Sequence, residues 1–181
     1  MLALLVLTAG SSVAHAVVRP SAATTTYYSV YGATVPGIRA SLDAKGPGGH
    51  DARANGYVAW RYSFVRSSRG CSIGSVSVTV RQRYTMPKWS MPTDAAADVR
   101  AAWDAYLVRL WVHEKGHGFL TRQAAAKVNF VLMRVGTRST CSALDAAASS
   151  VAKSQMRLDG LRQAAYDART SHGATQGATF G

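Results

Sequence analysis

The sequence predicts an α+β domain in which strands come first and helices follow. Between residues 60 and 80, apolar and polar side chains alternate with a period of two, which is typical of strands with one buried face. From residue 94 onward, apolar side chains recur at the spacing of an amphipathic helix. The length of 181 residues fits one domain with a core of moderate size.

The first 16 residues have the features of an export signal. An apolar run is followed by Ala14-His15-Ala16, a small-residue ending that is typical of a cleavage site. Because the run is too short to span a bilayer, residues 1–16 are predicted to be a cleaved signal peptide, and the mature chain to be periplasmic or secreted without a transmembrane segment. The usual positively charged start is absent, and a buried N-terminal helix is the alternative.

The next residues predict a short strand and a short helix. Residues 17–26 are small and polar and are predicted to be a flexible lead-in. The run from Tyr27 to Tyr31 is aromatic and β-branched, which predicts a strand. Thr34 and Pro36 are helix-start residues, so a helix is expected to run through Ala44. The Gly-rich residues 45–49 then end this helix.

Two alternating segments predict a β-hairpin. Trp60, Tyr62 and Phe64 are separated by polar residues, and residues 76–80 show the same alternation with valines. Residues 67–70, Ser-Ser-Arg-Gly, supply the turn. If either strand borders a cleft, its free backbone groups could pair with an extended peptide. The alternative is an ordinary sheet edge that binds no substrate.

The second half predicts two helices. Residues 86–92 form a proline-containing break, after which Thr93 is expected to cap a helix from Asp94 to Arg134. Such a helix would be about 60 Å long, which exceeds the expected width of the domain, so a break or bend is predicted. Gly116 and Gly118 have the lowest helix propensity in this segment and are the expected positions of the break. Alternatively, they allow another backbone segment to approach a metal closely. A second helix, over residues 144–165, is predicted to pack back on the first.

The predicted chemistry centres on His113-Glu114-Lys115-Gly116-His117, an H-E-x-x-H sequence within the long helix. Residues four apart on a helix share a face, so His113 and His117 can bind one ion. Glu114 is poorly placed to bind the same ion but well placed to take a proton from a water that the metal activates. It is also the only glutamate in the chain. The pattern therefore predicts a zinc hydrolase.

Two cysteines and a strongly basic composition set further expectations. Export and an even count predict a disulfide between Cys71 and Cys141, with free buried thiols as the alternative. The formal net charge of +12 would attract anionic envelope polymers, acidic proteins or nucleic acid by general electrostatics. No run of five basic residues occurs, and no helix has a basic stripe interleaved with aromatics, so specific nucleic-acid binding is not predicted.

With these features, the chain resembles a bacterial family of predicted secreted zinc-dependent proteases, domain of unknown function 922. The resemblance rests on the strands around Tyr28 and Trp60, the cysteine pair, the helix motif and the tail at residues 166–177. It implies a minimal zincin-like fold and peptidase activity. Tyr166 and Arg169, within that tail, are candidates to stabilise the oxyanion of the transition state.

The third zinc ligand departs from better-known zincins. A metzincin would have Gly and His where this chain has Leu120 and Gln123, and a thermolysin-like enzyme would need a second glutamate, which the chain lacks. Of the remaining histidines, His50 follows a glycine-rich loop, whereas His172 precedes a glycine that would let the backbone approach the metal helix. His172 is therefore the predicted third ligand. Asp167 is the oxygen alternative, or else a group that orients a ligand histidine.

Taken together, the sequence predicts an exported zinc metallopeptidase that hydrolyses protein or peptide substrates with Glu114 as general base. One alternative is a non-catalytic envelope protein that binds zinc or an anionic polymer. Another is a zinc hydrolase that cleaves a cell-wall amide. The presence of Glu114, which a purely structural metal site would not need, favours an enzyme.

Overall fold

A 20-residue strand, β4 (Gly70–Trp89), forms the axis of the fold in a computed structural model, which describes residues 15–181. Strand β3 (Arg53–Ser67) pairs with it antiparallel, while β1 (His15–Pro20) and β2 (Thr24–Val30) pair with it in parallel. Because β3 occupies one edge of β4 opposite both short strands, β1 and β2 must follow one another along the other edge. The result is an extended four-stranded sheet.

The predicted hairpin is confirmed and is longer than expected. Ser67 pairs with Gly70 across the turn, and pairing continues to Arg53 opposite Thr85. The predicted break at residues 86–92 begins only after Trp89, because β4 continues through Pro87. The pairing between β3 and β4 ends at Thr85, before Pro87. Proline has no N–H to donate, and at this position no hydrogen bond to β3 is required.

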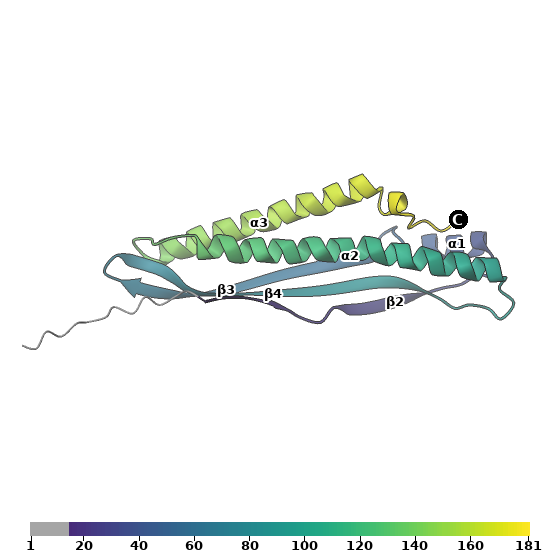
Figure 1. Cartoon of the computed structure of the whole chain (residues 1–181), viewed down its shortest axis with the longest axis horizontal. Helices are drawn as coiled ribbons and strands as arrows, with labels where there is room; N and C mark the ends of the chain where they lie inside the picture. The colour runs from purple at the N-terminus through teal and green to yellow at the C-terminus, as the bar shows by residue number, and fades with distance from the viewer. Residues whose placement is uncertain (1–14) are drawn as a thin grey trace, which may run out of the picture.

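Helix α2 (Ala97–Met133) lies along one face of the sheet, and α3 (Cys141–Thr170) packs on α2 (Figure 1). Helix α1 (Val35–Lys45) and a 3-10 turn, η1 (Ala174–Gln176), lie at the opposite end from the hairpin turn. These elements confirm the predicted α+β class. Thr34 caps α1 as predicted, since its Oγ1 accepts a hydrogen bond from the Gly37 N–H at 3.3 Å.

Helix α2 corrects two predictions. It begins at Ala97, three residues after the expected start, and its N-cap is Ala96, so Thr93 does not cap it. It is also unbroken over 37 residues. That length, about 55 Å, is accommodated because the domain is elongated and the 20 residues of β4 extend over about 65 Å. The expected break assumed a domain of globular width.

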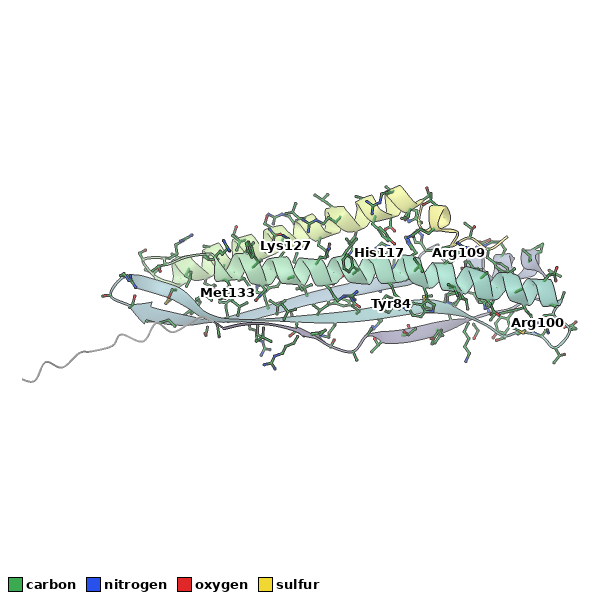
Figure 2. All side chains as sticks on the ribbon, viewed as in Figure 1. Tyr84, Arg100, Arg109, His117, Lys127 and Met133 are labelled. Atoms are coloured by element: carbon green, nitrogen blue, oxygen red, sulfur yellow. A yellow bond between two sulfur atoms is a disulfide. The ribbon has the colours of Figure 1, made fainter. Side chains whose placement is uncertain are left out.

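The two glycines of α2 make room for tyrosine side chains rather than for a bend or another backbone. A Cβ on Gly116 would lie 2.1 Å from Tyr166 Oη, and a Cβ on Gly118 would lie 2.2 Å from Tyr84 Oη. Figure 2 shows Tyr84 on the sheet side of α2 and His117 on the side that faces α3. The tertiary contacts therefore outweigh the weak helix propensity of glycine.

The N-terminal segment differs from the predicted flexible lead-in over residues 17–26. Most of this segment belongs to β1 and β2, because the open edge of β4 offers backbone partners to small and polar residues. The predicted signal peptide, residues 1–16, lies outside the described residues except for His15 and Ala16, whose backbones begin β1.

Two apolar clusters stabilise the elongated domain from either end. One joins α1, β2, the end of β4 and the first half of α2, and includes Ile38, Met86 and Trp103. The other joins the hairpin, the second half of α2 and the start of α3, and includes Val78 and Val128. The histidines of α2 lie between the two clusters, so both ends of the core fix the position of that stretch of helix.

The predicted disulfide is present. Cys71 and Cys141 are joined, with their Cα atoms 5.0 Å apart, and connect the start of β4 to the start of α3. Within residues 15–181, no helix has the length and apolar character needed to cross a membrane.

Candidate metal centre

Three side chains from two helices converge at the middle of the molecule. His113 and His117 lie one helical turn apart on α2, and Asp167 lies near the end of α3. The two Nε2 atoms are 3.3 Å apart, and Asp167 Oδ1 is 3.3 Å from His113 Nε2 and 2.9 Å from His117 Nε2. These are the only three His, Cys, Asp or Glu side chains in residues 15–181 that place potential ligand atoms within 4.8 Å of one another.

A glutamine amide orients each histidine ring. His113 Nδ1 lies 3.0 Å from Gln176 Oε1, and His117 Nδ1 lies 2.7 Å from Gln163 Oε1. An amide oxygen can only accept a hydrogen bond, so this pairing protonates each Nδ1 and leaves the lone pair of each Nε2 available to bind a metal. Burial also lowers the pKa of His113, which favours the neutral ring that a metal requires.

Tyr166 supports the first histidine from α3. Its ring stacks on His113 with the centroids 5.1 Å apart and the planes 11° apart, and its hydroxyl donates to the His113 carbonyl at 3.3 Å. Arg169 lies against Tyr166, with its guanidinium 5.6 Å from the ring centroid. Neither residue lines the pocket at the metal centre, so both differ in placement from the oxyanion role that the sequence suggested.

The end of α3 turns sharply and brings the backbone close to His113. Ser171, His172 and Gly173 have φ of 47°, 51° and 91°, and the His172 N–H donates to the Asp167 carbonyl at 2.9 Å. A Cβ on Gly173 would lie 3.0 Å from His113 Cγ, so the prediction that this glycine permits a close approach is confirmed.

The same turn moves His172 away from the other two histidines. Its side chain is 61% exposed, its Nδ1 lies 3.8 Å from Asp167 Oδ1, and it is outside the group of three potential ligands. The structure therefore brings Asp167, the oxygen alternative from the sequence, to the two histidines, and not His172. His50 stacks near His172 with ring centroids 5.0 Å apart, and both line the pocket.

Glu114 is buried beside this group, with 4% of its surface exposed. Burial, and to a smaller extent the negative charge of Asp167, raise the pKa of its carboxyl to about 7. A hydrogen bond from the Ala54 backbone and the positive charge of Arg53 partly oppose this effect. Glu114 can therefore exchange a proton near neutral pH.

A pocket of about 480 Å³ opens onto His113, His117 and Asp167. One wall consists of residues 49–56, which form the approach to β3 and its first residues, and the opposite wall consists of α2 and α3 side chains that include Glu114 and Asp167. Among the described strands, β3 pairs only with β4, so its second edge is free. Ala54 and its neighbours line the same pocket as Glu114, so this free edge lies at the site.

A partly buried polar network fixes the loop that forms the rim of the pocket. Arg39 forms an ion pair with Asp51, and Tyr106 Oη donates to Asp51 Oδ2 at 2.7 Å. Tyr28 Oη donates to the Asp51 carbonyl at 2.7 Å. Burial raises the pKa of both tyrosines, which therefore remain neutral donors. The network positions the loop that contains His50.

A family model described as "Bacterial protein of unknown function (DUF922)" matches residues 25–173. The chain belongs to this family. No curated protein and no solved structure gives a significant match. The part that matches DUF922 includes His113, Glu114, His117 and Asp167 but ends before Gln176.

In this DUF922 chain, the polar residues that support the histidines carry no motif of their own in the sequence. Gln163 is one helical turn before Asp167, and its amide nitrogen also donates to the His117 carbonyl at 3.3 Å and to Asp159 Oδ1 at 3.4 Å. Thr170 Oγ1 lies 3.5 Å from His113 Nδ1. The only sequence signal was the helical spacing between Gln163 and Asp167, which becomes visible once α3 is known to extend to Thr170.

Proposed function

We propose that this protein is an exported, zincin-like zinc peptidase in which His113, His117 and Asp167 bind the metal and Glu114 is the general base. The observation that supports this most strongly is the triangle of two imidazole nitrogens and one carboxylate oxygen beside a buried glutamate. Asp167 replaces the predicted His172 in this proposal.

The triangle fits a zinc ion. Ligand atoms at the usual 2.0–2.2 Å from a tetrahedral zinc are separated from one another by about 3.3–3.6 Å. The three separations here are 3.3, 3.3 and 2.9 Å, so only a small movement is needed. Three protein ligands with a fourth position open to the pocket are typical of catalytic zinc, which when bound lowers the pKa of water and polarises a carbonyl.

Glu114 supplies the proton transfer. Its carboxyl lines the pocket, and its pKa of about 7 lets it take a proton from water and later give that proton to a leaving amine. A bound cation would favour the ionised form of Glu114, which is the form that acts as a base. Gln163 and Gln176 keep the two imidazoles in the tautomer that binds metal.

The free edge of β3 supports a peptide as substrate. An extended peptide could pair with the backbone of residues 52–56 and so place a carbonyl beside Glu114. A small cell-wall amide would make no use of such an edge. The disulfide between Cys71 and Cys141 supports an oxidising compartment, and hence export.

Metal analysis and a cleavage assay test the proposal together. The purified mature protein should contain about one zinc per chain and should cleave members of a peptide library, and removal of zinc by a chelator should abolish cleavage. Cleavage of cell-wall amides without cleavage of any peptide would favour the alternative hydrolase. Zinc binding without hydrolysis of either substrate class would favour a binding protein.

A further inference from the structure

The sheet has a one-sided charge distribution, and most of its charged side chains lie outside the pocket at the candidate metal centre. Its four strands contain no acidic residue, and all nine acids of the chain lie in helices or loops. The strands contain seven cations, namely Arg19, Arg53, Arg61, Arg66, Arg81, Arg83 and Lys88. The sheet is therefore uniformly positive, while the helices have mixed charge.

Much of this charge lies on the face of the sheet away from α2 and α3, called here the outer face. On β4 the alternate residues Val76, Val78 and Val80 are buried, so residues 77, 79, 81 and 83 point the other way. Arg61 pairs with Ser77, and Arg19 pairs with Thr79, which places both arginines on the outer face. Figure 1 shows α2 and α3 on one side of the sheet only.

The outer face is hollowed where β1 ends and β2 begins. This hollow has a volume of about 360 Å³ and is lined by Ser21, Ala22, Thr24, Tyr57, Arg81, Gln82 and Arg83. Ser21 Oγ donates to the Val80 carbonyl at 2.8 Å, so its proton is already used. The strongest donors at the hollow are therefore the guanidinium groups of Arg81 and Arg83.

These two arginines have no acidic partner. No ion pair in residues 15–181 involves Arg81 or Arg83, and both side chains are exposed. They lie two residues apart on the same face of a strand, so their Cα atoms are separated by about 7 Å. Two guanidinium groups at that spacing are better suited to bind successive anionic groups of a linear polymer than to bind one small anion.

We propose that the outer face, centred on this hollow, binds a linear polyanion whose phosphodiesters join polyol or sugar units that carry no nucleobases. Guanidinium groups bind phosphate oxygens in pairs, and the other cations of the outer face extend the contact along the sheet. Tyr57, 58% exposed, is the one aromatic ring at the hollow. A surface that selects single-stranded nucleic acid would need several such rings on which bases stack. The site is separate from the metal centre, so it can tether the protein without blocking the pocket.

Binding to a lipid-free poly(glycerol phosphate), compared with oligodeoxythymidine of equal phosphate number, tests the proposal. Wild-type protein should bind the glycerol phosphate polymer more tightly. Arg81→Gln/Arg83→Gln should weaken that binding about tenfold or more and reduce the slope of log affinity against log salt by about 1 to 2. Lys153→Gln/Arg157→Gln removes the same charge from exposed positions on α3 and should change the affinity less than about twofold.

Three outcomes would overturn the proposal. Equal weakening by both double variants would mean that net charge alone drives binding. Tighter binding of the oligonucleotide would mean that the surface is built for nucleic acid, and absence of binding to either polymer would remove the site. Arg81→Lys/Arg83→Lys keeps both charges and controls for loss of binding through misfolding. This variant should unfold at the wild-type temperature. It should nevertheless bind the polymer several-fold more weakly, because lysine lacks the forked donor geometry of arginine.

Discussion

His117 Nε2 lies 2.9 Å from Asp167 Oδ1, and this contact joins the histidine helix to the C-terminal helix at the centre of the molecule. The contact completes a set of two nitrogens and one oxygen. For the proposed zinc site it favours Asp167 over His172 as third ligand, because the turn after Thr170 directs His172 outward.

The first prediction separates Asp167 from His172. Asp167→Ala should reduce zinc affinity more than the 10- to 100-fold loss that is typical when a supporting residue around a metal is removed. His172→Ala should change it little, since His172 lies outside the ligand triangle. Competition with a zinc chelator measures both affinities. A large loss in the histidine variant alone would restore His172 as the ligand.

A second prediction concerns the glutamines that orient the rings. Gln163→Ala and Gln176→Ala should each lower zinc affinity by about 10- to 100-fold, because each removes the acceptor that fixes an Nδ1–H. Gln123→Ala, at an exposed position on the same helix as the histidines, is the matched control and should have no effect. Wild-type affinity in both test variants would contradict the assigned tautomers.

Two helical glycines give opposite predictions for stability. Gly160 on α3 has no atom within 4 Å of an added Cβ, so Gly160→Ala should stabilise the protein by up to about 1 kcal/mol. Gly116→Ala should destabilise it and weaken zinc binding, because the new Cβ would collide with Tyr166 Oη. Thermal unfolding of both variants measures the difference, and stabilisation by both would show that Tyr166 moves aside easily.

The pKa of Glu114 predicts how pH changes the stability of the metal-free protein. Folding raises this pKa from 4.5 to about 7, so the stability that it contributes is present below pH 4.5 and is lost as the pH rises through 7. Between about pH 5 and pH 8, wild type should lose about 2–3 kcal/mol of unfolding free energy relative to Glu114→Gln. Urea titrations of both proteins at the two pH values measure the loss. An unchanged difference between them would mean that Glu114 stays ionised throughout.

The parts of the site that depend on local spacing could be predicted from the sequence, and the parts that depend on distant elements could not. His113, Glu114 and His117 follow from helical geometry alone. The position of Asp167, and not His172, beside the two histidines depends on two features of the tail. Helix α3 reaches Thr170, five residues beyond its predicted end, and a left-handed turn follows it. The unbroken α2 depends on tyrosines that fill the space beside its glycines, which no local pattern reveals.

Hydrolysis by zinc-loaded Glu114→Gln tests the central proposal most directly. The variant should bind about one zinc per chain, as wild type does, because Glu114 is not among the three ligands. It should cleave a peptide substrate at least about 10²- to 10⁴-fold more slowly than wild type, because the amide cannot accept the proton. Cleavage at the wild-type rate with zinc bound would contradict the proposal.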